Sequence, residues 1–303
     1  MSVATPPIDA TLPQRVAPPR SRPWYLDVWV QMVRRKPLST AGAAIVLVML
    51  AAAVGADLIS PYGFAETSLR ERFIAMNGAH WLGTDQLGRD LLTRLIHGAR
   101  VSLYVGFGAV LIGSVLATAI GILSAYFGGR VDMLVQRGVD AWMAFPPLLL
   151  LMSIMSLVGP SAWNITIVLG VAFGIQNSRV VRGVALGIKE NTYIESARAM
   201  GSGHLAIATR HILPNTLPTI IVVATTGLST VILTEASLSF LGLGVPPPFP
   251  TWGGMLSLAG LDHMYQAPWL AIWPAVALSL AVFGFNMLGD GLRDLLDPRL
   301  KGG

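Results

Sequence analysis

The sequence predicts an all-α membrane protein with six transmembrane helices. Of its 303 residues, 53% are hydrophobic and only 12% are charged, whereas soluble domains usually carry about 25% charged residues. Residues 101–129 and 141–178 contain no Asp, Glu, Lys or Arg, and each stretch exceeds the roughly 20 apolar residues that cross a bilayer. These observations argue strongly against a soluble enzyme and indicate an integral membrane protein with several spans.

Six apolar runs give the expected spans in order along the chain. They are residues 38–59, 101–127, 141–158, 162–178, 217–241 and 267–288. The third and fourth runs are short and are separated by Gly159-Pro160, a dipeptide typical of a turn. They therefore either cross the bilayer fully or form a re-entrant pair, and both arrangements leave the later spans with the same orientation.

Residues 1–37 precede the first span and are predicted to form a cytoplasmic, partly disordered tail. The tail is rich in proline and poor in apolar residues up to Pro23, a composition that favours disorder. Trp24, Tyr25 and Trp29 follow and favour a short interfacial helix, because amphipathic aromatic side chains settle at the headgroup level. No cleavable signal peptide is visible in this tail.

The distribution of Lys and Arg among the loops predicts the orientation. Sixteen of these residues lie in segments on one side of the expected spans, and five lie on the other side, all within residues 70–100. Loops rich in Lys and Arg face the cytoplasm, so both termini, 1–37 and 291–303, are predicted to be cytoplasmic. The same bias explains the net charge of +5 without nucleic-acid binding, because the longest basic run is Arg34-Arg35-Lys36.

The sequence lacks the common motifs of catalysis, nucleotide binding and metal binding. The sequence contains no cysteine, no G-x-x-x-x-G-K-[ST] phosphate loop, no H-E-x-x-H and no G-x-S-x-G. We therefore expect no catalytic residue, no metal site and no cofactor bound by this chain. Function is expected in the core, 101–290, and in the segments 60–100, 179–216 and 242–266 outside the spans.

The cytoplasmic segment 179–216 contains a predicted docking helix. Residues 189–200 are largely good helix formers, and Gly201 with Gly203 provides a stop. The chain then returns to the fifth span at Pro214. A short helix that projects from the cytoplasmic face is suited to contact another protein.

This segment resembles the EAA motif of bacterial ABC importer permeases. The matching residues are Glu195, Ser196, Ala197, Gly201, Leu213 and Pro214. In that family the loop forms a coupling helix, which sits in a groove of the ATP-hydrolysing subunit and transmits its closure to the membrane spans. Ser196 and His211 depart from the usual alanine and isoleucine, which still permits a tight helix contact and puts only local packing in doubt.

Three further motifs resemble the C-type permease subunit of the dipeptide, oligopeptide and nickel branch. The first is Leu82-Gly-Thr-Asp-Gln-Leu-Gly-Arg-Asp90 with Arg94, Gly98, Arg100, Ser102 and Leu103; the second is Glu235-Ala-Ser-Leu-Ser-Phe-Leu-Gly-Leu-Gly244 with Pro247, Pro248, Trp252 and Gly253; the third is Asn286-Met-Leu-Gly-Asp290-Gly-Leu-Arg293-Asp294 with Asp297, Pro298 and Leu300. Together with the cytoplasmic motif, the resemblance covers residues 30–301.

The resemblance implies the type I ABC importer permease fold in the bacterial inner membrane. The implied partners are a second permease subunit, two ATP-binding subunits that hold ATP and Mg²⁺, an extracytoplasmic substrate-binding protein and the lipid bilayer. Di- or oligopeptides are the implied cargo, and nickel, glutathione or another small solute is the alternative. A channel or an ion-gradient-driven secondary transporter is the rival from another class, although internal repeats typical of such transporters are not visible.

The external segment 60–100 has two interpretations. Its candidate residues are Gly83, Thr84, Asp85, Gly88, Arg89 and Asp90. In the structural interpretation, Thr84 or Asp85 caps a helix, and Arg89 forms a local ion pair with Asp85 or Asp90. In the functional interpretation, the motif contacts cargo or a binding protein directly.

Glu235 is the one acidic residue well inside an expected span. An ionised residue at the centre of a membrane helix costs about 2.5–3.5 kcal/mol, so this side chain should face the bundle or a watery cavity. Thr234, Ser237 and Ser239 are near enough in sequence to help satisfy it. Glu235 is either a structural hydrogen-bonding group or part of the translocation path.

Small residues at four-residue spacing predict close helix contacts. Ala109 with Gly113 and Gly170 with Gly174 are such pairs, and small side chains let membrane helices approach one another closely. We expect packing seams within the bundle rather than a dimer motif.

Overall fold

The computed structural model describes residues 36–257 and 263–296, whose regular structure is helical. The long helices are α2 (Pro37–Val54), α4 (Leu91–Phe127), α7 (Ala162–Lys189), α10 (Leu213–Phe240) and α13 (Trp269–Leu296). The shorter ones are α3 (Ala56–Ile59), η1 (Leu69–Glu71), α5 (Gly129–Met143), α6 (Pro147–Val158), α8 (Thr192–Ala199), α9 (His204–Ile207), η2 (Ala208–Ile212) and α11 (Trp252–Leu256). The disorder and the interfacial helix predicted for the N-terminal tail lie outside the described residues.

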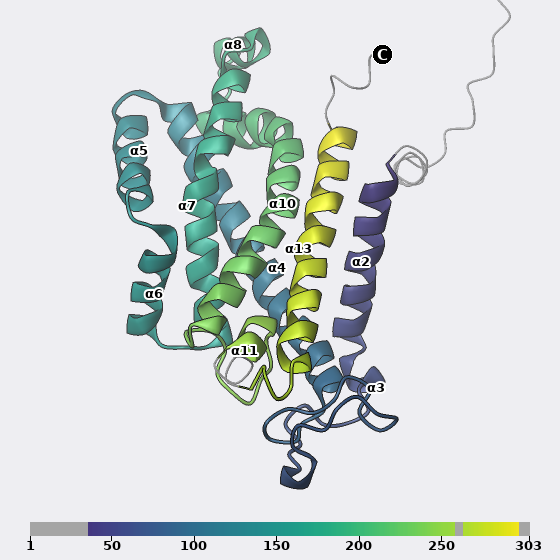
Figure 1. The fold of residues 1–303 in the computed structure, drawn as a ribbon. Coiled ribbons are helices and arrows are strands. Elements are labelled where there is room, and N and C mark those ends of the chain that lie inside the picture. The colour runs from purple at the N-terminus through teal and green to yellow at the C-terminus, as the bar shows by residue number, and fades with distance from the viewer. Residues whose placement is uncertain (1–35, 258–262, 297–303) are drawn as a thin grey trace, which may run out of the picture.

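The five long helices lie side by side in one bundle, with α5 and α6 along one edge (Figure 1). α8 lies at one end of this bundle, and the loops that hold η1 and α11 lie at the other; we call them the α8 end and the α11 end. α2 begins and α13 finishes at the α8 end, where Lys36 and Asp294 form an ion pair. These ends therefore lie on the same side as α8, in agreement with the arrangement that the charge distribution predicts.

Four helical runs are long and apolar enough to cross a membrane: α2, α4, the run 204–240 that ends with α10, and α13. The bent pair α5 and α6 meets the same criterion when taken together. α7 is more polar and falls outside that criterion, but its 28 residues extend about 42 Å, and it packs along α4. Five of these units lie where spans were expected and are apolar enough to cross a membrane, whereas the fourth expected span, 162–178, falls in the more polar α7.

The third expected span, 141–158, is broken near its start. α5 and α6 meet at 88° around Pro146 and Pro147, because a proline disfavours helical geometry in the residue before it and is favoured at the first position of the next helix. α6 has 12 residues, about 18 Å, which is too short to cross a bilayer alone. The sharp bend fits either a broken span or a re-entrant loop, the two alternatives that the sequence left open.

The helix cap predicted at Thr84 or Asp85 is wrong. α4 begins directly after Asp90, whose carboxylate accepts the backbone N–H of Thr93 at 2.8 Å. Asp85 instead accepts a backbone N–H two residues further along, and Gly88 has a φ of +70°. Since that left-handed conformation cannot continue a right-handed helix, Thr84 and Asp85 remain in the preceding loop.

Small residues bring α4 and α7 into close contact. A Cβ atom added to Gly113 would lie 2.7 Å from the carbonyl oxygen of Gly170, and one added to Gly170 would lie 3.0 Å from that of Ala109. A Cβ on Gly174 would lie 2.9 Å from the carbonyl oxygen of Gly113. The two predicted pairs therefore face each other across one seam, which confirms the interpretation as packing within the bundle.

Candidate functional site

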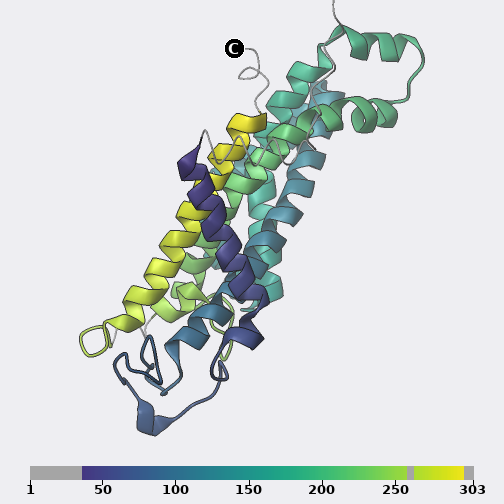
Figure 2. The same ribbon diagram turned by 90° about the vertical axis from the view of Figure 1, so that its right-hand side faces the viewer.

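The segment that holds α8 projects past the ends of α2 and α13 (Figure 2). Glu195 and Ser196 are exposed on α8, and Gly201 is exposed in the turn that follows. Ala197, on the opposite side of the helix, is buried. Four of the six residues of the cytoplasmic motif thus share one short projecting helix and its turn.

Gly201 ends α8, as the sequence predicts. Its φ of +82° lies in the left-handed region that favours glycine. The N–H of Gly201 donates to the carbonyl of Arg198 at 2.9 Å, and that of Ser202 donates to the carbonyl of Ala197 at 3.0 Å, which is a Schellman motif. A Cβ here would meet no described atom within 4 Å, so glycine is required by backbone conformation rather than by space.

The buried side of α8 is packed on the bundle. Ile194 is 0% exposed and Ala197 2%, and Ile194 belongs to an apolar cluster with residues of α4, α7 and η2. The Tyr126 hydroxyl, near the end of α4, lies 2.7 Å from Nδ1 of His204, and the Arg198 guanidinium lies 5.5 Å from the centre of the Tyr126 ring. The segment of α8 and α9 therefore contacts the end of α4, and Ile194 shares its apolar cluster with residues of α7.

The exposed side of α8 and of the turn that leads into α9 combines apolar and charged side chains. Tyr193 on α8, Met200 directly after it and Leu205 on α9 are 43%, 80% and 75% exposed. Glu195 and Arg198 on α8 are exposed as well. Large exposed apolar side chains rimmed by charge are typical of a protein interface.

Leu213 and Pro214 occupy a different place from the rest of the motif. They form the first two positions of α10, directly after the π-helical turn η2. His211 lies within η2 and is partly buried, with its ring centre 6.3 Å from that of Tyr193. The histidine ring thus lies between η2 and α8.

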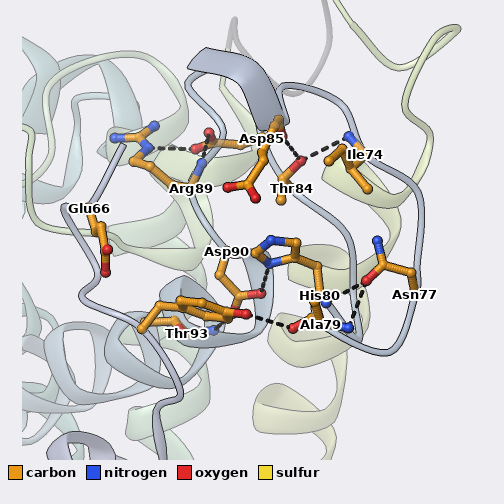
Figure 3. A network of polar contacts seen from close by, with 12 residues as sticks. Glu66, Ile74, Asn77, Ala79, His80, Thr84, Asp85, Arg89, Asp90 and Thr93 are labelled. Atoms are coloured by element: carbon orange, nitrogen blue, oxygen red, sulfur yellow. Dashed lines mark hydrogen bonds and ion pairs between the residues drawn. The ribbon is translucent and has the colours of Figure 1, made fainter. Parts of the chain in front are cut away.

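At the α11 end, Asp85 is the centre of a buried polar network (Figure 3). Its Oδ2 accepts from Nε of Arg89 at 2.6 Å and lies 3.6 Å from Nε of Arg94. Its Oδ1 accepts the backbone N–H groups of Leu87 and Arg89 at 2.8 and 3.0 Å. Because Asp85 and Arg89 are 4% and 9% exposed, loss of the Asp85 carboxylate would leave the Arg89 charge buried without its ion-pair partner.

Asp90 pairs with histidine rather than with Arg89. One carboxylate oxygen caps α4, and the other lies 2.9 Å from Nδ1 of His80, as Figure 3 shows. His80 is 5% exposed, and its ring stacks on Tyr62 with 4.9 Å between the ring centres. Sequence reasoning missed His80, which connects the loop to the first turn of α4.

Thr84 and Gly88 fix the loop against neighbouring backbone. The Thr84 hydroxyl accepts the N–H of Ile74 at 2.9 Å, and the Thr84 carbonyl accepts Nε1–H of Trp269 at 3.2 Å. A Cβ added to Gly88 would lie 1.8 Å from the carbonyl oxygen of Ser68. No side chain fits at Gly88, so this turn requires glycine.

The six candidate residues of the external motif thus lie together and direct their polar groups inward. Gly83 has a φ of +83° and packs its backbone against the Trp269 indole. This burial favours the structural interpretation over direct contact with cargo. The side chains that the α11 end presents outward include Leu69, Met76 and Trp81, which are 69%, 55% and 69% exposed.

Glu235 is 0% exposed and connects α10 to α4. Its carboxylate accepts from the Ser102 hydroxyl at 3.2 Å and from the Ser239 hydroxyl at 2.6 Å. Thr234 and Ser237, which the sequence also suggested as partners, donate instead to carbonyls of their own helix, each at 2.8 Å. This arrangement favours a structural hydrogen-bonding role for Glu235 over a place on the translocation path.

Glu235→Gln is expected to leave assembly and transport within about twofold of the wild type, because the amide can still bond to both serine hydroxyls. Glu235→Leu removes both hydrogen bonds and is expected to destabilise the protein by about 1–3 kcal/mol, measured as a lower Tm in detergent. Loss of transport in a fully assembled Glu235→Gln protein would contradict the structural role.

Ion pairs that sequence reasoning missed tie α5 to α7. Arg182 donates from Nε and a terminal nitrogen to both carboxylate oxygens of Asp132, at 2.6 and 2.5 Å, and Arg179 pairs with Asp140. The partners are 50 and 39 residues apart in sequence, so no local pattern identifies them. These contacts hold the bent pair of helices against the bundle.

The described part of the chain contains no group of three or more His, Asp or Glu side chains that could hold a metal ion. The buried carboxylates accept from serine, from backbone N–H groups or from cationic partners instead. Such sites are suited to hold helices and loops in place.

Comparisons with known proteins agree on one family. The model of the family described as binding-protein-dependent transport system inner membrane component matches residues 117–302. A dipeptide transport system permease protein from Alkalihalophilus pseudofirmus is 39% identical over 287 residues, 94% of each chain. A glutathione transport system permease protein from Pectobacterium atrosepticum is 40% identical over 283 residues, 92% of each chain.

A solved structure supports the fold independently. The inward-facing MetNI methionine ABC transporter matches with a TM-score of 0.55 and 20% identity, over 67% of this chain and 96% of that one. The predicted type I ABC importer permease fold is thereby confirmed. The family match begins inside α4 and includes the α8 segment, Glu235 and α13. The chain therefore belongs to the binding-protein-dependent transport system inner membrane components, the permease subunits of ABC importers.

Proposed function

We propose that this chain is one of two permease subunits of an ATP-driven importer of di- or oligopeptides. The two relatives described above are named for dipeptide and glutathione transport, and glutathione is itself a tripeptide. The observation that carries the proposal is α8, a projecting helix with an exposed apolar and charged side and a buried side packed on the bundle.

α8 is the proposed docking element for an ATP-binding subunit, with the α8 end and both termini in the cytoplasm. Met200 and Leu205 would enter a groove of that subunit, and Ile194 with Ala197 would pass its movement to α4 and α7. ATP-driven closure opens one mouth of the bundle only if the docked state favours one bundle conformation over the other.

The other partners follow from the same proposal. A homologous permease subunit completes the path, and two ATP-binding subunits hold ATP and Mg²⁺. An extracytoplasmic substrate-binding protein delivers cargo to the α11 end, where the exposed Trp81 and Met76 are suited to contact it.

Reconstitution tests this function. The chain is co-expressed with candidate permease, ATPase and binding-protein subunits and assembled in proteoliposomes with labelled di- and tripeptides. We expect uptake that requires ATP and the binding protein, with peptides as better competitors than nickel. Uptake that is driven by an ion gradient and does not require ATP would overturn the proposal in favour of a secondary transporter.

A further inference from the structure

A cavity of about 260 Å³ lies between the bend of α5 and α6, α7 and α10. Its lining includes Trp142, Phe145, Phe173, Gln176, Thr230 and Thr234. Gln176 lies about 21 Å along α7 from its first residue, and Thr230 lies about 15 Å from the last residue of α10. Both helix ends lie at the α11 end, so the cavity is near the middle of a hydrocarbon core about 30 Å thick.

Three polar side chains of this cavity have no partner among the described residues. They are the amide of Gln176, the hydroxyl of Thr230 and the indole N–H of Trp142, whereas the Thr234 hydroxyl donates to a carbonyl of its own helix at 2.8 Å. An unsatisfied polar group in lipid hydrocarbon costs several kcal/mol. We therefore expect this surface to face water or a polar ligand rather than acyl chains.

A second cavity has the character expected of a lipid-facing groove. It measures about 530 Å³, lies between α2, α4 and α13, and is lined by apolar side chains such as Ile45, Val48 and Leu280. The indole N–H of Trp252, which also lines it, is satisfied by the Leu95 carbonyl at 3.1 Å. The indole N–H of Trp273, which lines the second cavity too, has no partner among the described residues, so the Gln176 amide and the Thr230 hydroxyl are what distinguish the first cavity from the second.

We propose that the first cavity is the cargo-facing surface of this chain and that it binds the backbone of a short peptide through neutral hydrogen bonds. The inference rests on the proposed function. The Gln176 amide and the Thr230 hydroxyl each donate and accept, and the Trp142 indole donates, which matches the C=O and N–H groups of peptide bonds. None of the thirteen described residues that line the cavity is charged, so a charged terminus finds no ion-pair partner there.

The size and the apolar walls of the cavity set its selectivity. Its volume is just below the roughly 300–1,000 Å³ typical of sites for whole small molecules, so it holds a segment of the peptide, and the second permease subunit supplies the rest. Phe145 and Phe173 can contact the side chains of the peptide, and neither favours a positively or a negatively charged peptide. Backbone recognition makes the site tolerant of peptide sequence.

Single-cysteine labelling tests the site in the assembled complex, because the chain has no native cysteine. Thr230→Cys is treated with a charged, membrane-impermeant methanethiosulfonate reagent in proteoliposomes, with and without a transported dipeptide. Val48→Cys, in the apolar cavity, is the matched control. We expect Thr230→Cys to react several-fold faster than Val48→Cys and the dipeptide to slow that reaction.

Two labelling results would overturn the site. Equal, slow reaction at both positions in every nucleotide state would mean that lipid or the second permease subunit covers the cavity. Reaction at Thr230→Cys that the dipeptide does not slow would mean a watery surface without cargo. If the same complexes show normal ATP-dependent peptide uptake, the proposed function still holds. If the wild-type complex shows no ATP-dependent peptide uptake, the proposed function itself is refuted.

Gln176→Leu gives a second, independent measurement. The peptide concentration for half-maximal uptake is expected to rise about five- to tenfold, the effect of one neutral hydrogen bond, and Gln176→Asn is expected to restore part of the affinity. Because Gln176 has no partner among the described residues, assembly should be unaffected and is checked by gel filtration. An unchanged half-maximal concentration in an assembled Gln176→Leu complex would also overturn the site.

Discussion

Gly201→Val is expected to remove most cargo-stimulated ATP hydrolysis and to lower uptake by about tenfold or more, while the chain still enters the membrane. A β-branched residue at a φ of +82° costs about 1–2 kcal/mol or more. The Schellman turn after Arg198 would relax to avoid that cost. Met200 and Leu205, which are proposed to enter a groove of the ATP-binding subunit, would then move, although an added Cβ at Gly201 meets no described atom within 4 Å. ATPase activity and labelled-peptide uptake in proteoliposomes measure the effect.

Gly203→Val is the matched control for this prediction. Gly203 lies two residues away in the same turn, has a φ of −66° and also has no described atom within 4 Å of an added Cβ. The same side chain is therefore added without left-handed strain, and near-normal activity is expected. If the Gly201→Val complex retains both the ATPase subunit and cargo-stimulated hydrolysis, α8 is not the coupling element.

Glu195→Lys tests the same element through its charge. Glu195 is exposed near the middle of α8, so reversal of its charge should leave the fold intact and disturb only a docked partner. We expect the purified complex to lose ATPase subunits or their cargo stimulation. Retention of both at wild-type levels would contradict an interface at this position.

The membrane spans, the close contact of α4 with α7 and the end of α8 could be predicted, because each depends on a residue pattern within a single helix. Charge-free stretches predict the spans because a bilayer excludes charge irrespective of the neighbours. The seam of Gly113 and Gly170 follows from four-residue spacing, since that spacing places small residues on one helix face. Gly201 is predictable for the same local reason: it ends a run of helix formers.

Contacts between distant segments could not be predicted in this way. Ser102 lies 133 residues from Glu235, and His80 reaches Asp90 across a loop that returns on itself. The wrong cap at Thr84 or Asp85 has a related cause. Both are good capping residues, but Asp85 accepts backbone N–H groups of the turn around Gly88. Asp90 is therefore the residue that caps the first turn of α4. The sequence did not indicate a role for Gln176, because a single amide side chain in an apolar run can be assigned one only from the cavity that it lines.

Gly170→Leu is expected to prevent stable assembly, because it separates the two helices on which the rest of the bundle is built. An added Cβ already meets Cβ of Ile112 at 2.9 Å and the backbone of Ala109 at 3.0 Å, so the larger side chain requires a backbone shift. Overpacking of a well-packed core typically costs about 1–3 kcal/mol, and a contact with backbone leaves no rotamer that avoids it.

Gly183→Leu is the matched control, since Gly183 lies in the same helix and no described atom lies within 4 Å of an added Cβ. We expect Gly183→Leu to purify like the wild type and Gly170→Leu to show a clearly lower Tm or little assembled complex. The pair separates helix propensity, which favours leucine over glycine equally at both sites, from packing, which differs between them. Equal stability of the two variants would mean that α4 and α7 are not in backbone contact, and the path from α8 into the bundle would then have to run through η2 and α10.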